Sequence, residues 1–118
     1  MPKLKPMAVL AAVVGLLAVA PLAVARTHAA QTTAVTVKAT EFHFALSRKS
    51  APHGTVVFKV TNRGHLAHNF KIAGKKTSLL GPGKSTTLKV KLAKGSYKYV
   101  CTVAGHAAAG MKGAFKAT

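Results

Sequence analysis

The clearest structural pattern in the sequence is Tyr97-Lys98-Tyr99-Val100-Cys101-Thr102-Val103-Ala104-Gly105-His106-Ala107-Ala108-Ala109-Gly110-Met111. Residues two apart in a β-strand share a face, so Cys101 lies on the same side as the two tyrosines, and Lys98 lies on the opposite side. Lysine favours water, and the strand is therefore predicted to turn Cys101 toward a core. The glycines and alanines that follow indicate a tight loop, after which a new strand is expected to begin near Met111.

The rest of the chain alternates short strand-like segments with turn signals. Strand-forming residues concentrate at 35–39, 55–61 and 88–92. Turn-forming residues concentrate at 52–54, 62–64, 81–83 and 94–95. No segment after residue 25 carries a sustained helical period. The sequence therefore predicts an all-β fold, a Greek-key β-sandwich of two sheets.

The N-terminal segment resembles an export signal. Lys3 and Lys5 precede an apolar run from Met7 to Val19, and Ala23-Val24-Ala25 forms the small-x-small pattern that a signal peptidase recognises. The apolar stretch is also long enough to span a bilayer, so an uncleaved membrane anchor is the alternative. Export would place the protein in the periplasm or another extracytoplasmic compartment. The predicted organisation is a signal segment at 1–25, a polar lead-in at 26–33 and a single domain at 34–118.

The charge balance is strongly basic. The chain has 18 lysine and arginine residues, one acidic residue, Glu41, and a formal net charge of +17. Such a surface repels its own copies and attracts acidic molecules, so we expect a monomer whose partners are acidic redox proteins, with an anionic membrane surface as a second option. A solvated basic surface suited to an unusual growth medium, with no role in binding, is the alternative. Nucleic acid is not expected, because the sequence has no arginine-rich stripe and no interleaved aromatic platform. A single carboxylate also excludes a hydrolase that works with paired carboxylates.

Glu41 itself is interpreted as an exposed residue of a strand. The two-residue spacing of apolar positions breaks between Ala39 and Phe42, which predicts a β-bulge near Thr40 and Glu41. His43, between two phenylalanines, is predicted to point away from the face that they bury.

Four side chains form a candidate metal site. Cys101, His106 and Met111 follow one another as Cys-x4-His-x4-Met, and His68 lies upstream. A thiolate, two imidazoles and a weak thioether form the donor set of copper sites that transfer electrons, because it suits both oxidation states of the ion. His68 is preferred to His65 because apolar residues follow His68 at two-residue spacing. Metal binding would also give a use to the lone thiol of an exported protein, which cannot form an internal disulfide.

Asn69 is expected to support this site. It follows His68 directly, and strand parity sets Asn69 and Lys71 opposite the face of His68. Its side chain or amide is predicted to pin the two ligand-bearing segments together, as outer hydrogen bonds do in other metal sites.

The quoted residues resemble the cupredoxins, the small blue copper proteins related to plastocyanin and azurin. The resemblance rests on residues 58–62 with His68-Asn69-Phe70, and on 97–101 continuing through Gly105-His106 to 110–113. It covers nearly all of the chain after the signal segment. One departure is Ala104, where many relatives have proline. The resemblance implies one mononuclear type 1 copper, with His68, Cys101 and His106 as strong ligands and Met111 as the axial ligand.

The function expected is a carrier of single electrons and not an enzyme. Partners would dock on a small apolar surface around His106, formed by Ala104, Gly105, Ala107, Ala108, Ala109 and Gly110. A dinuclear copper centre would need a second cysteine, and a multicopper oxidase would need histidines flanking Cys101, where the chain has valine and threonine. Two alternatives stay open: a periplasmic protein that stores or delivers copper, and a metal-free β-sandwich interaction module.

Overall fold

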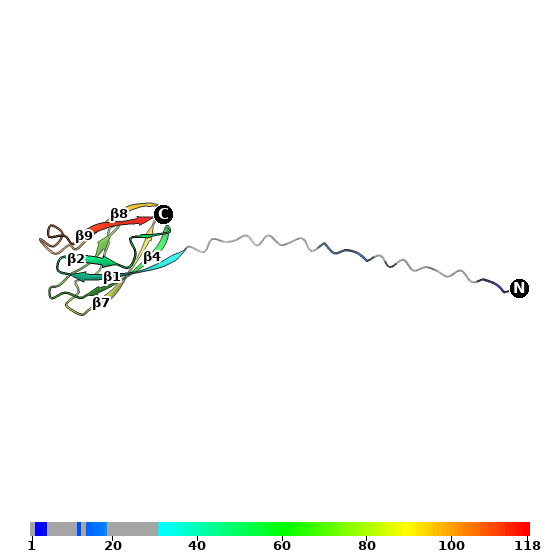
Figure 1. Ribbon diagram of the computed structural model, residues 1–118, viewed down its shortest axis with the longest axis horizontal. Coiled ribbons are helices and arrows are strands. Elements are labelled where there is room, and N and C mark those ends of the chain that lie inside the picture. Colours follow the sequence, from blue (N-terminus) through cyan, green and yellow to red (C-terminus); the bar gives the residue numbers. More distant parts are fainter. Residues whose placement is uncertain (1, 5–11, 13, 19–30) are drawn as a thin grey trace.

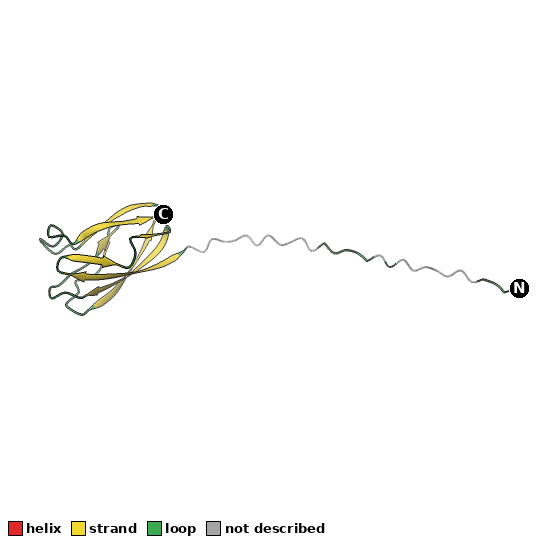
Figure 2. Ribbon diagram, viewed as in Figure 1, coloured by secondary structure: helices red, strands yellow, loops and turns green. Residues whose placement is uncertain are grey.

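The computed structural model describes residues 2–4, 12, 14–18 and 31–118. The strands in this part of the chain are β1 (Thr32–Thr40), β2 (His43–Leu46), β3 (Ser50–Ala51), β4 (Gly54–Asn62), β5 (Lys71–Ile72), β6 (Lys75–Lys76), β7 (Ser85–Leu92), β8 (Gly95–Val100) and β9 (Lys112–Ala117). Strands and loops account for all of the described chain (Figure 2). Among these residues, no helix has the length and apolar character that crossing a membrane requires. The predicted signal segment falls largely outside the described residues.

The strands form two sheets (Figure 1). The first has the order β2-β1-β4-β7, in which β1 and β4 run parallel and the other neighbours antiparallel. The second has the order β3-β9-β8-β5-β6, in which β3 and β9 run parallel. The predicted all-β sandwich is confirmed.

The core lies between the sheets and follows from the alternation of apolar and polar residues. The buried apolar positions of the two long parallel strands are Val35, Val37 and Ala39 in β1 and Val56, Phe58 and Val60 in β4. Phe58 packs at the centre, with its ring centroid 5.2 Å from that of Phe70 and 5.3 Å from that of Phe115. Burying one such side chain contributes about 1.5–3 kcal/mol to folding. The lysines of β7 and β9 point outward, as the period-two pattern predicts.

The prediction of a bulge near Thr40 is wrong. β1 ends at Thr40, which pairs with His43 at the start of β2, so Glu41 and Phe42 form the two-residue turn of a hairpin. The break in spacing therefore marks a chain reversal, not an inserted residue. Because of the turn, Phe42 remains 39% exposed while Phe44 is buried, and the two rings do not share a buried face. β1 also begins at Thr32, within the segment predicted as a lead-in.

The turn between β1 and β2 and the loop between β8 and β9 lie at the same end of the sandwich. This end is opposite the C-terminus (Figure 1). The candidate ligands are brought together at this end.

Candidate metal centre

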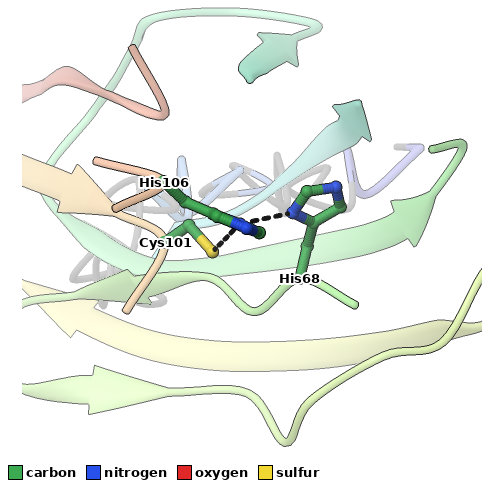
Figure 3. A group of neighbouring side chains, drawn as sticks. All are labelled: His68, Cys101 and His106. Carbon is green, nitrogen blue, oxygen red and sulfur yellow. Dashed lines mark hydrogen bonds between the residues drawn. The ribbon is translucent and has the colours of Figure 1, made fainter. Parts of the chain in front are cut away.

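His68, Cys101 and His106 form one buried group. A donor atom from each residue lies within 4.8 Å of the other two. Nδ1 of His68 is 3.1 Å from Nδ1 of His106, and Sγ of Cys101 is 3.5 Å from the same His106 nitrogen (Figure 3). The exposed fractions of the three residues are 1%, 1% and 8% in the order of the chain. His68 thus joins two donors that lie more than 30 positions further along the chain, and the three residues bring two imidazole nitrogens and a sulfur together.

The spacing of these donors fits a metal ion. Bond lengths of about 2.0 Å to nitrogen and 2.3 Å to sulfur, in a trigonal arrangement, require donor separations of about 3.5–3.7 Å. Two of the observed separations are 3.1 and 3.5 Å, and all three donor atoms lie within 4.8 Å of one another, so the group has the dimensions of a site for one ion. Two imidazoles and a thiolate are the donors that copper accepts in electron-transfer sites.

His68 is positioned by an irregular segment fixed at both ends. Its backbone forms an isolated β-bridge with Leu80, with N···O distances of 3.1 and 2.8 Å. Before it, the buried Asn62 organises the loop: its amide donates to the carbonyls of Leu66 and Leu80, and its Oδ1 accepts from the N–H of Gly64. These hydrogen bonds fix the backbone that carries the imidazole.

The loop that carries Cys101 and His106 is closed by hydrogen bonds to Met111. The N–H of Cys101 donates to the carbonyl of Met111, and the N–H of Met111 donates to the carbonyl of His106, both at 3.1 Å. Gly105 and Gly110 have φ values of 82° and 124°, which residues with a Cβ rarely adopt. The side chain of Met111 is fully buried, in agreement with its predicted inward face. Met111 is therefore buried next to the candidate ligands Cys101 and His106, and its backbone is hydrogen-bonded to the backbone of both.

Asn69 connects the two segments that carry the donors. Its Oδ1 accepts a hydrogen bond of 2.8 Å from the N–H of Thr102, and its Nδ2 donates to Oγ1 of Thr102 at 2.6 Å. Thr102 is the residue after Cys101, so this pair of bonds fixes the His68 segment to the cysteine segment. Strand parity placed Asn69 on the wet side, but Asn69 is buried while Lys71 is exposed. The double hydrogen bond explains why a polar side chain is buried there.

Two residues of the β1–β2 turn contact the histidines from outside, and the sequence reasoning missed both contacts. The Glu41 carboxylate accepts a hydrogen bond of 3.0 Å from Nε2 of His68. The ring of Phe42 packs edge-on against His106, with centroids 5.1 Å apart. Glu41 is therefore not the plain surface residue that was expected. The break in apolar spacing at residues 40–42 was the sequence signal for this turn.

The electrostatics of Glu41 follow from its hydrogen bonds. Backbone donation from Leu66 is the largest cause that lowers its pKa, helped by His68 and by the N–H of His65, and the pKa falls from 4.5 to about 2. Glu41 is thus a carboxylate at neutral pH. It is the single negative side chain in the sequence and lies directly against a candidate ligand.

The predicted docking residues surround His106 on the loop. Their accessibility is as follows: Ala104, Gly105, Ala108, Ala109 and Gly110 are exposed, and Ala107 is partly buried. Phe42, which contacts His106, adds a partly exposed aromatic ring to this apolar surface.

A family model described as copper binding proteins, plastocyanin/azurin family, matches residues 26–117. The chain is a cupredoxin. This cupredoxin has a group of two histidines and one cysteine that can bind a single copper ion, at the positions predicted for the strong ligands. The comparison with curated protein sequences finds no match.

Solved structures of rusticyanin and of two auracyanins share the fold of this cupredoxin. Rusticyanin from Thiobacillus ferrooxidans is 24% identical with a TM-score of 0.64, over 74% of this chain and 77% of that one. Reduced auracyanin from Roseiflexus castenholzii is 22% identical with a TM-score of 0.60, over 74% and 96%. Auracyanin A from Chloroflexus aurantiacus is 17% identical with a TM-score of 0.62, over 75% and 100%. At these identities the similarity establishes the fold.

Proposed function

We propose that this cupredoxin carries single electrons between redox partners outside the cytoplasm, as a type 1 copper protein and not as an enzyme. The observation that carries the proposal is the convergence of Nδ1 of His68, Nδ1 of His106 and Sγ of Cys101 at separations of 3.1 and 3.5 Å in a buried site. This donor set suits both oxidation states of copper.

In this proposal His68, Cys101 and His106 would hold the ion as strong ligands, and Met111 would add its thioether as a weaker one. Bound copper supplies the one-electron change between its cuprous and cupric forms. The chain keeps the three donors in a fixed arrangement through the Asn69–Thr102 hydrogen bonds and the bonds that close the loop at Met111. Because the same arrangement serves both forms, little reorganisation accompanies electron transfer. Burial of the donors keeps water away.

Electrons would enter and leave at His106. It is the most exposed of the three donors, at 8%, and apolar loop residues and Phe42 surround it. A partner that docks on this surface needs to remove little bound water, and the imidazole edge then gives a short path to the metal. Docking here uses the residues predicted from the sequence, from Ala104 to Gly110, with Phe42 added to them.

The basic charge would select the partner. The excess of lysines attracts acidic redox proteins and raises their association rate, an effect that salt weakens. Export of the protein through its N-terminal segment, with cleavage or with retention as an anchor, is part of this proposal and would bring it to such partners. Anionic lipid would attract the same surface.

The test is an absorption spectrum of the purified protein after one equivalent of cupric ion is added. We expect intense visible absorption from sulfur-to-copper charge transfer in the wild type and none in Cys101→Ser. Thr102→Ser, which keeps a hydroxyl beside the site, is the matched control and should remain coloured. A colourless wild-type protein that is fully folded would refute the proposal.

A second measurement separates a carrier from a copper-delivery protein. The copper-loaded protein is reduced and reoxidised repeatedly, and its copper content is measured with and without a copper chelator of moderate affinity. A carrier keeps its copper through the cycles. Rapid loss of copper to the chelator on reduction would support delivery instead, and full activity of Cys101→Ser in binding a partner would support a metal-free interaction module.

A further inference from the structure

Glu41 occupies a site built from backbone donors. Its Oε1 accepts hydrogen bonds from the N–H groups of His65 and Leu66, each at 2.7 Å, and from Nε2 of His68 at 3.0 Å. The Glu41 side chain is 24% exposed, whereas that of His68 is 1% exposed. Three donors from one short segment thus converge on a single oxygen that comes from the β1–β2 turn.

The loop opposite Glu41 is shaped to receive the carboxylate. A Cβ atom built on Gly64 would overlap the carboxylate of Glu41, so a side chain at this position would push it away. Asn62 holds the same loop by accepting from the N–H of Gly64 at 2.8 Å and donating to the carbonyl of Leu66 at 2.7 Å. The donors are therefore fixed by interactions that do not involve Glu41, and the carboxylate fits a preformed recess.

The hydrogen bond to Glu41 determines where the imidazole of His68 carries its proton. Oε1 of Glu41 accepts hydrogen bonds from the N–H groups of His65 and Leu66, each at 2.7 Å, so the same oxygen is the acceptor in its contact with His68. Nε2 of His68 must therefore be the donor. A neutral imidazole with its hydrogen on Nε2 has a free lone pair on Nδ1, and Nδ1 is the atom that lies 3.1 Å from Nδ1 of His106.

We propose that Glu41 is a positioning residue of the copper site, which selects the Nε2–H tautomer of His68 and places a negative charge that favours the oxidised site. The inference rests on the proposed function for its redox part only. Hydrogen bonds from a ligand histidine to a carboxylate fix ring orientation and raise the basicity of the ligand. A negative charge near the ion stabilises the form with the larger positive charge, so Glu41 lowers the reduction potential.

The first test reads the tautomer directly in the copper-free protein. Long-range proton–nitrogen NMR spectra of the imidazole rings distinguish Nε2–H from Nδ1–H. We expect His68 to be in the Nε2–H form in the wild type and in Glu41→Gln, whose amide oxygen can accept the same hydrogen bonds. In Glu41→Ala a mixture of tautomers is expected. An Nδ1–H tautomer or a mixture in the wild type would overturn the positioning role, whatever the copper spectrum shows.

The second test measures the reduction potential of the copper-loaded protein by voltammetry. Glu41→Gln should raise the equilibrium constant for reduction about tenfold, which for one electron is about 59 mV. Gly64→Ala should also raise the reduction potential, because the added Cβ displaces the Glu41 carboxylate from His68 but leaves its charge in the protein. Lys116→Gln is the charge control, since Lys116 is exposed and pairs with Ser96 at the far end of β8 from Cys101.

A potential in Glu41→Gln equal to that of the wild type would overturn the electrostatic role. A change in the reduction potential of Glu41→Gln that is no larger in magnitude than that of Lys116→Gln would overturn it as well. If Glu41→Ala does not fold, Glu41→Gln and Gly64→Ala still decide the question. A wild-type protein that gives no blue colour would refute the proposed function and leave the tautomer measurement as the test of this inference.

Discussion

Replacing Asn69 by alanine removes both hydrogen bonds that fix the His68 segment to the Cys101 segment. The bonds, at 2.6 and 2.8 Å, join a buried side chain to Thr102. One intramolecular hydrogen bond contributes about 1 kcal/mol net, so Asn69→Ala should lower the free energy of unfolding by about 2 kcal/mol. For a domain of this size that corresponds to a fall in Tm of about 8–16 °C.

A double-mutant cycle assigns this loss to the pair. Thr102→Val removes the hydroxyl acceptor and keeps the backbone N–H, so it should cost about 0.5–1 kcal/mol alone. Once Asn69 is alanine, the same change should cost almost nothing further, which gives a coupling energy of about 0.5–1 kcal/mol. Thr102→Ser keeps both bonds and should match the wild type.

The assay is urea unfolding of the copper-free protein, followed by circular dichroism, with copper affinity measured in parallel. Asn69→Ala should also bind cupric ion more weakly, because the two donor segments are no longer held together. The reasoning is refuted if Asn69→Ala unfolds within about 0.5 kcal/mol of the wild type, or if the effects of Asn69→Ala and Thr102→Val simply add.

Three further outcomes are expected. Phe58→Ala, at the centre of the core, should lower the free energy of unfolding by about 3–5 kcal/mol in denaturant titrations; a loss below 1 kcal/mol would contradict the packing described. The pKa of Glu41 is about 2 in the folded protein and 4.5 in its ordinary state. The stabilisation from its ionised form is therefore complete above pH 4.5 and is lost as the pH falls toward 2. When the free energy of unfolding is measured against pH, Glu41→Gln should show a smaller decrease over this interval than the wild type. Electron transfer to an acidic redox protein should slow steeply as ionic strength rises in stopped-flow measurements, and a rate independent of salt would contradict steering by the lysines.

Strand parity predicted most of what depends on neighbours along the chain. The inward faces of β8 and β9 were correct because lysines alternate with apolar residues there, and burial of charge is costly enough to fix the register. The same rule placed Cys101 and Met111 inside. Asn69 was the exception, since Thr102 on another segment satisfied its amide.

The contacts of the β1–β2 turn were beyond sequence reasoning. Glu41 and His68 are 27 positions apart and belong to irregular segments, where neither period two nor period 3.6 applies. The break in spacing at residues 40–42 was visible, but a bulge and a tight hairpin produce the same local pattern. Only the position of the backbone N–H groups of His65 and Leu66 distinguishes an exposed acid from one turned toward a ligand.

The inward bond of Glu41 has a consequence for crowded solutions of this protein. When two copies approach one another, their lysines repel. Glu41, the one acidic side chain that could pair with a lysine of another copy, is already hydrogen-bonded to His65, Leu66 and His68. For Glu41 of one copy to pair with a lysine of another, it would have to break its hydrogen bond with His68, the candidate metal ligand that it supports. Multivalent anions, such as sulfate or polyphosphate, are therefore expected to bridge the molecules, and dense samples without them should stay dispersed.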